Sequence, residues 1–297
     1  MATLRELKGR IGSVASSEKI TGAMKMISSA KMHKAEGALR RLQPYRRQVE
    51  TVIKSLLSSD AQFESPLIEK REVHNCALIA WGSDDGLCGA YNANLAKLLP
   101  ATLQQIRNTY GANVNITVLA VGSKMLKAAK RYASAGVAVK AVETVNSKSE
   151  GSAVKDFLNT VKDSFIQGEY DLVELLYMQY HSASRQRATN SAFLPLDPST
   201  VTGNSPTDKK AATTRPYIFE PDAASIFATV IPMYLLAVME DVFTENRASE
   251  QAARVMAMQS ANDNAKKLLD QLRLEYNKLR QQAITNELLD IVGGQIK

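Results

Sequence analysis

Residues 222–297 read DAASIFATVIPMYLLAVMEDVFTENRASEQAARVMAMQSANDNAKKLLDQLRLEYNKLRQQAITNELLDIVGGQIK, with no proline after Pro232 and no glycine before Gly293. Proline and glycine are the residues that interrupt helices most strongly, so the segment predicts one almost unbroken helix. At a rise of about 1.5 Å per residue, a helix from Asp222 to Ile291 would span roughly 100 Å, several times the width of a compact domain. We therefore expect a rod, which in a soluble protein transmits force, sets a distance or presents a surface.

Small and apolar residues recur in this segment at steps of three and four, which is the pattern of a coiled-coil seam. The predicted seam positions are Met258, Ala261, Ala265, Leu268, Leu272, Tyr276, Leu279 and Ala283. Further apolar residues are concentrated in the last 14 positions: Ile284, Leu288, Leu289, Ile291, Val292 and Ile296. Free helix ends are normally polar or frayed, so this apolar tip predicts that another protein surrounds it.

A second long helix is predicted near the N-terminus, in residues 1–60. Its seam consists of Leu4, Leu7, Ile11 and Val14, and apolar residues resume at Met24 and Ile27. Glycine residues in this segment favour close approach to another helix. Because the two ends of a domain usually lie close together, the two long helices are expected to pair as an antiparallel coiled coil.

Between these helices, short apolar runs alternate with helical segments over residues 73–195. The runs at 73–81, 114–121, 137–142 and 172–180 predict strands, and the polar residues 182–187 predict a surface turn. The predicted fold class is α/β: a long antiparallel coiled coil of the N- and C-terminal helices with an inserted Rossmann-like domain. Five of the nine prolines lie between residues 195 and 221, so residues 196–221 predict a linker. The predicted domains are thus 1–60, 73–195, 196–221 and 222–297.

Charge and cysteine content limit the classes of function. Residues 1–50 carry eleven Lys or Arg against four Asp or Glu, so the net charge of +7 resides there and predicts an acidic partner. Cys76 and Cys88 have no metal-binding spacing and are expected to be small buried side chains. The apolar run 226–239 is too short, and too interrupted by Thr229 and Pro232, to predict a membrane span. A basic coiled-coil protein that binds nucleic acid remains an alternative, although aromatic residues are not interleaved with the cations.

The turn SDDGLCGA, residues 83–90, follows a predicted strand and opens a helix, which is a place where α/β proteins bind phosphate. Its glycine spacing matches neither common nucleotide-binding motif, and Asp84 and Asp85 would repel phosphate. The three histidines are isolated, and no carboxylate pair is placed for acid–base work. We therefore expect no catalytic residue, no cofactor and no metal, and we hold a nucleotide-using enzyme as a third reading.

Four runs in this order resemble the gamma subunit of F-type ATP synthase: SSEKITGAMKMISSAKM (16–32), GLCGAYN (86–92), ASEQAARVMAMQSANDNAKKLL (248–269) and YNKLRQQAITNELLDIVGG (276–294). The resemblance extends over nearly the whole chain. It implies a non-catalytic rotor shaft that couples ion-driven rotation of the membrane c-ring to ATP synthesis or hydrolysis at the beta subunits. Many members carry a basic residue where this chain has Asp85. A contact made by that basic residue in other members is therefore not expected in this chain.

The resemblance also implies which residues meet which partners. Contacts to beta-subunit loops are implied for Met24, Lys25, Arg254, Arg280, Gln281 and Thr285. An apolar bearing in the alpha–beta head would receive Ile284, Leu288, Ile291 and Val292. Tyr217 and Glu220 match the stretch at the foot, which meets the c-ring and the epsilon subunit, while Asp222 is also a plausible helix N-cap.

The implied partners are therefore the alpha, beta and epsilon subunits and the c-ring, with no nucleic acid. No presequence is obvious at the N-terminus, which favours a bacterial protein or an already processed organellar one, and of these we choose the bacterial protein. We accordingly expect a peripheral membrane protein, attached through its complex to the cytoplasmic face of the bacterial inner membrane.

Overall fold

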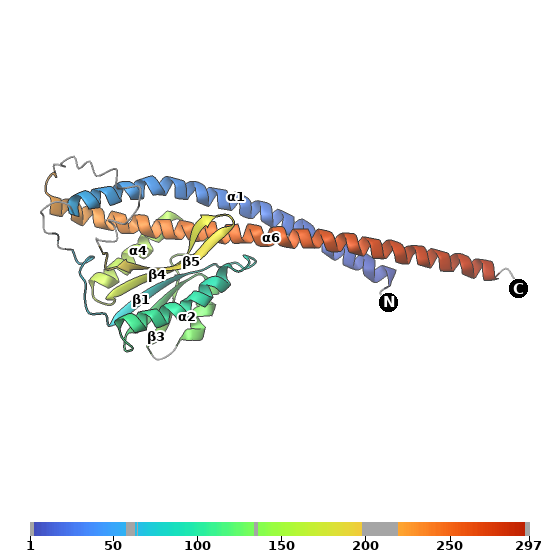
Figure 1. Cartoon of the computed structure of the whole chain (residues 1–297), viewed down its shortest axis with the longest axis horizontal. Helices are drawn as coiled ribbons and strands as arrows, with labels where there is room; N and C mark the ends of the chain where they lie inside the picture. Colours follow the sequence, from blue (N-terminus) through green and yellow to red (C-terminus); the bar gives the residue numbers. More distant parts are fainter. Residues whose placement is uncertain (1–2, 58–62, 64, 134–135, 198–218, 295–297) are drawn as a thin grey trace. The chain divides into compact units, whose positions relative to one another are not determined.

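The computed structural model describes residues 3–57, 63, 65–133, 136–197 and 219–294, with the side chains of 292–294 left undescribed. Two long helices, α1 (Leu4–Leu57) and α6 (Ala223–Gly294), enclose an α/β segment in the chain order (Figure 1). The elements between them are β1 (Asn75–Trp81), α2 (Tyr91–Tyr110), β2 (Asn115–Val121), α3 (Ser123–Ala129), the short η1 (Lys130–Tyr132), β3 (Val137–Val142), α4 (Gly151–Ile166), β4 (Leu172–Ser182) and β5 (Arg185–Leu194).

The strands form one five-stranded sheet in the order β3-β2-β1-β4-β5. The pairs β1–β2, β1–β4 and β2–β3 are parallel, whereas β5 is antiparallel to β4. This arrangement confirms the predicted α/β fold class with its two long helices. The surface turn predicted at 182–187 is wrong in part, because Arg185 and Arg187 begin strand β5.

Two hydrophobic cores lie on the two faces of the sheet. Alternate residues of β1 point to opposite cores, so Ile79 and Trp81 join α1, α4 and α6 on one face while Leu78 joins α2 and α3 on the other. Burial on both faces explains why β1 reads as a continuous apolar run. Trp81 packs edge-on against Phe157 at 6.4 Å between ring centroids, and lies 5.8 Å from Phe243 of α6.

The chain divides into two compact units: a coiled-coil unit of residues 1–30 and 254–297, and a sheet unit of residues 31–253. In the coiled-coil unit, Asn262 donates from Nδ2 to the carbonyl oxygen of Glu18 at 2.7 Å and to Oγ1 of Thr21 at 3.3 Å. A Cβ on Gly22 would come within 3.4 Å of the same Nδ2, so this glycine allows the close approach that the sequence predicted.

Two predicted seam positions are wrong. Leu268 is 45% exposed and Ile27 is 58% exposed, whereas their neighbours Leu269 and Ser28 are buried. Buried or half-buried residues of α6 instead follow a seven-residue repeat: Met258, Asn262, Ala265, Leu269, Leu272, Tyr276, Leu279 and Ala283. The predicted seam was chosen by its apolar residues, but the observed seam includes the polar Asn262. Hydrogen bonds from Asn262 to α1 satisfy its side chain.

By length and composition alone, α6 contains an 18-residue window apolar enough to cross a membrane, with a mean hydropathy of 1.8. The helix continues through Pro232, as the sequence predicted. Half of the window is buried inside the protein, and Phe227, Ile231 and Leu235 belong to the core of the sheet unit. A core helix of a soluble protein passes the same test.

Candidate functional site

The apolar tip of α6 is exposed, as its sequence predicted. Ile284 is 45% exposed, Leu288 58% and Ile291 62%. Neighbouring Leu289 is 64% exposed, and the side chain of Val292 lies outside the described ones. Isolated apolar residues on a surface are ordinary, but a concentration at one helix end indicates a surface that another protein covers.

The six predicted contact residues lie on both helices of the coiled-coil unit. Arg280, Gln281 and Thr285 are exposed within two turns of α6, and Thr285 donates from Oγ1 to the carbonyl oxygen of Gln281 at 2.9 Å. Met24 and Lys25 are half-buried on α1. Arg254 differs from these residues because only 7% of it is exposed, so most of its side chain packs within this chain.

The stretch before α6 is described only from Phe219 onward, so the predicted contact residue Tyr217 lies outside the described residues. Glu220 is exposed. Asp222 caps α6, because its Oδ1 accepts from the backbone N–H of Ser225 at 2.8 Å and its Oδ2 accepts from the Ser225 hydroxyl at 2.7 Å. The backbone bond, followed by the hydroxyl bond, lowers the pKa of Asp222. The predicted N-cap is confirmed.

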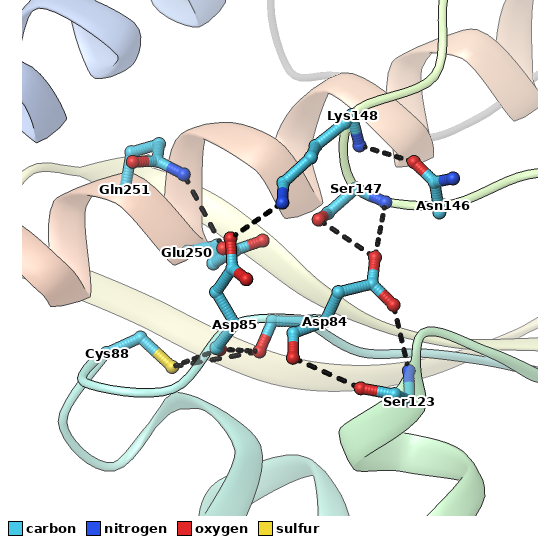
Figure 2. A network of polar contacts seen from close by, with 10 residues as sticks. Asp84, Asp85, Cys88, Ser123, Asn146, Ser147, Lys148, Glu250 and Gln251 are labelled. Carbon is cyan, nitrogen blue, oxygen red and sulfur yellow. Dashed lines mark hydrogen bonds and ion pairs between the residues drawn. The ribbon is translucent and has the colours of Figure 1, made fainter.

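Asp84 occupies the place where the turn 83–90 could have bound an anion (Figure 2). Its Oδ1 accepts from the N–H of Ser123 at 3.0 Å, and its Oδ2 accepts from the N–H of Ser147 at 3.2 Å and the Ser147 hydroxyl at 3.1 Å. These serines follow the carboxyl ends of β2 and β3, where doubly wound sheets bind ligands. The carboxylate of Asp84 therefore uses donors that a phosphate would need.

Asp85, the next residue of this turn, pairs with Lys148 at 3.1 Å (Figure 2). Both side chains are more than half exposed, so the pair contributes little to stability. Cys88 is part of this turn and is 2% exposed, and Cys76 is fully buried, which confirms the expected burial of both thiols. Among the residues that the structure describes, no group of three His, Cys, Asp or Glu could hold a metal ion.

Glu245 is a largely buried carboxylate that sequence reasoning missed. Burial raises its pKa to about 7, the negative charge of Asp241 adds to the rise, and the backbone N–H of Tyr180 and the charge of Arg46 oppose it. Its Oε2 atom is buried without a hydrogen-bond partner among the described residues. Nothing in the surrounding helical sequence marks Glu245, because its environment is built by β4 and α1.

Replacing Glu245 with glutamine is expected to stabilise the chain at pH 8 and to change little at pH 5. A carboxyl whose pKa is about 7 when folded and 4.5 when unfolded stabilises below pH 4.5, and this contribution is lost as the pH rises through 7. The gain at pH 8 should be at most roughly 3 kcal/mol. Urea unfolding at both pH values measures it, with the exposed Glu275→Gln as control. An equal effect of Glu245→Gln at both pH values would contradict the assignment.

Comparison with known proteins adds sequence and fold relationships. Residues 3–295 match the family model described as ATP synthase. The chain is 40% identical to the ATP synthase gamma chain of Bacteroides thetaiotaomicron, covering 100% of both chains. It is 35% identical to the gamma chain of Polynucleobacter asymbioticus, covering 99% of each.

Solved structures share the fold. A chain of the Euglena gracilis mitochondrial ATP synthase, described as OSCP/F1/c-ring, superposes with a TM-score of 0.62 at 23% identity, covering 98% of this chain and 93% of that one. A chain from the Tetrahymena thermophila mitochondrial ATP synthase central stalk and c-ring gives 0.54 at 19% identity, covering 82% and 99%.

Proposed function

Because the chain belongs to the family of ATP synthase gamma chains, we propose that it is the central rotor shaft of an F-type ATP synthase. It couples ion-driven rotation of a membrane c-ring to ATP synthesis, or to hydrolysis in reverse. The observation that carries this proposal is 40% identity over the full length of both chains. The exposed apolar tip of α6 supports it, because a shaft end needs a surface that turns inside another protein.

In this proposal the head of the complex consists of alpha and beta subunits. The tip residues Ile284, Leu288, Ile291 and Val292 turn in an apolar bearing. Beta-subunit loops meet Met24, Lys25, Arg254, Arg280, Gln281 and Thr285. The exposure of Arg280, Gln281 and Thr285 supports this role, because their polar groups can bond carboxylates that pass them. Only 7% of Arg254 is exposed, so a beta-subunit loop reaches only a small part of this residue.

The sheet unit is the foot, which lies with the epsilon subunit and the c-ring. The c-ring meets the stretch with Tyr217 and Glu220. The solved neighbours are described as parts of F1, c-ring and central-stalk assemblies, which supports this placement. The complex is membrane-associated, and we place the chain at the cytoplasmic face of a bacterial inner membrane because the two sequence relatives named above are bacterial.

The chain performs no bond chemistry in this proposal. Each angle of an asymmetric shaft presents a different surface to each beta subunit, so rotation biases the affinity of each site for nucleotide. This is coupling by differential contact between states. The bonds of Asp84 support the absence of a nucleotide site at the foot, because they use the nearby donors.

The test is ATPase activity of purified alpha and beta subunits from the same source, with and without this chain. We expect a stable complex and an activation of at least about tenfold, equivalent to about 1.4 kcal/mol of barrier. Circular dichroism establishes that the added chain is folded. A folded chain that neither assembles nor activates would overturn the proposal.

A further inference from the structure

One edge of strand β4 is completed by a helix. On the side facing β1, pairing of β4 ends at Leu176, which lies opposite Ala80. Two residues further on, Met178 donates its backbone N–H to Oδ1 of Asn246 at 3.0 Å. The carbonyl oxygen of Met178 accepts from the hydroxyl of Ser249 at 3.2 Å. Beyond the last β1–β4 pair, two side chains of α6 thus bond the backbone groups of β4 that a longer β1 would have bonded.

These contacts are buried, and both polar atoms of the Asn246 side chain are hydrogen-bonded. Asn246 is 4% exposed and Ser249 is 0% exposed. Oδ1 of Asn246 also accepts from the hydroxyl of Tyr91 at 3.1 Å, and its Nδ2 donates to the carbonyl oxygen of Val242 at 2.7 Å.

Polar contacts also join helix α1 to both β4 and α6. Arg46 of α1 donates from Nη1 to Oδ2 of Asp241 on α6 at 2.7 Å. Glu36 of α1 accepts a hydrogen bond from the hydroxyl of Tyr180 on β4. The three elements α1, β4 and α6 are therefore joined pairwise by polar contacts, all within the sheet unit.

We infer that Asn246 and Ser249 are positioning residues that prevent α6 from turning or sliding on the sheet, so that torque passes between the foot and the shaft. The inference rests on the proposed function. The hydrophobic effect is non-directional, whereas a hydrogen bond weakens steeply when its angle or distance changes, so these bonds add a directional constraint to the packing of α6. Load on the sheet therefore reaches α6 through the bonds to Met178, and reaches α1 through Arg46 and Glu36.

The experiment uses the complete ATP synthase containing Asn246→Leu, reconstituted in vesicles. Leucine preserves volume but leaves the Met178 N–H without its acceptor. The ions pumped per ATP hydrolysed are measured with a pH dye or a sodium indicator. We expect hydrolysis to stay within about twofold of the wild type, while the ratio of ions to ATP falls by about twofold or more. Ser249→Ala should produce a smaller fall of the same kind.

The matched control is Asn108→Leu, an exposed asparagine of the sheet unit that bonds only to Gln104 on its own helix among the contacts described. Fluorescence of Trp81, the only tryptophan in the chain, reports folding of the sheet unit. A folded Asn246→Leu complex with an unchanged ion-to-ATP ratio would overturn the inference. If Asn246→Leu does not fold, an unchanged ratio in Ser249→Ala overturns it. Failure of the wild-type chain to assemble or activate would instead overturn the proposed function.

Discussion

Replacement of Arg46 with methionine is expected to lower the free energy of unfolding by about 2 to 4 kcal/mol at pH 8. Its guanidinium bonds Oδ2 of Asp241 at 2.7 Å and Oε1 of Glu50 at 2.9 Å. Asp241 is only 7% exposed, so the variant leaves a charged carboxylate without its cation in a poorly hydrated place. About a third of the Arg46 side chain reaches water, which keeps the loss below that of a fully buried pair.

The loss should be smaller at pH 5 than at pH 8. Arg46 also opposes the rise in the pKa of Glu245, which burial raises to about 7. Removing Arg46 therefore raises the pKa of Glu245 further, which costs stability at pH 8, whereas at pH 5 Glu245 is protonated with or without Arg46. Urea unfolding followed by Trp81 fluorescence measures both values.

Two variants separate this ion pair from a general effect of charge. Arg47→Met removes a neighbouring exposed cation of α1 and should change stability by less than about 0.5 kcal/mol. Arg46→Met combined with Asp241→Leu removes both charges and should recover part of the loss. Equal losses for Arg46→Met and Arg47→Met would contradict a stabilising role of the ion pair.

Much of the fold could be predicted from local sequence. The long helices follow from the scarcity of helix-breaking residues, and the parallel strands from their apolar runs. Strand β5 was missed because RQRATNSAFL, residues 185–194, is only half-buried and lacks clear alternation. It lies at the sheet edge, and only its pairing with β4 makes it a strand. The shifted seam at Asn262 has the same origin, since its partners are 241 and 244 residues away in the chain.

In the candidate site, too, some residues could be predicted from local sequence and others could not. An apolar helix tip is visible in the sequence because its residues are adjacent in the chain. Nothing in the helical sequence marks Asn246, Ser249 or Glu245. Their roles depend on contacts that form only where α6 packs against the edge of β4. Asp84 was expected to repel phosphate, and the structure adds that it bonds the N–H groups of Ser123 and Ser147.

Gly122→Ala is expected to destabilise the sheet unit by about 2 to 6 kcal/mol. Gly122 has a φ of 89°, a backbone conformation that side chains disfavour, which alone costs about 1 to 3 kcal/mol. A Cβ there would also lie 2.9 Å from the carbonyl oxygen of Gly82 and 3.0 Å from that of Ser83. Because both obstacles are backbone, relief requires the ends of β1 and β2 to separate, which adds a further cost of about 1 to 3 kcal/mol.

Gly111→Ala is the matched control. Gly111 has a φ of 110°, and a Cβ there would meet nothing within 4 Å, so its substitution carries the conformational cost without the crowding. Urea unfolding of the two variants should therefore give a larger loss for Gly122→Ala, with the difference reporting the crowding alone. Separation of the β1 and β2 ends would also pull Asp84 away from Ser123, so the variant should lose the protection of the Ser123 amide from hydrogen exchange. Equal losses for both variants would contradict this account. They would mean that the backbone at Gly82 and Ser83 moves away from residue 122 at no cost, so that the close approach does not affect stability.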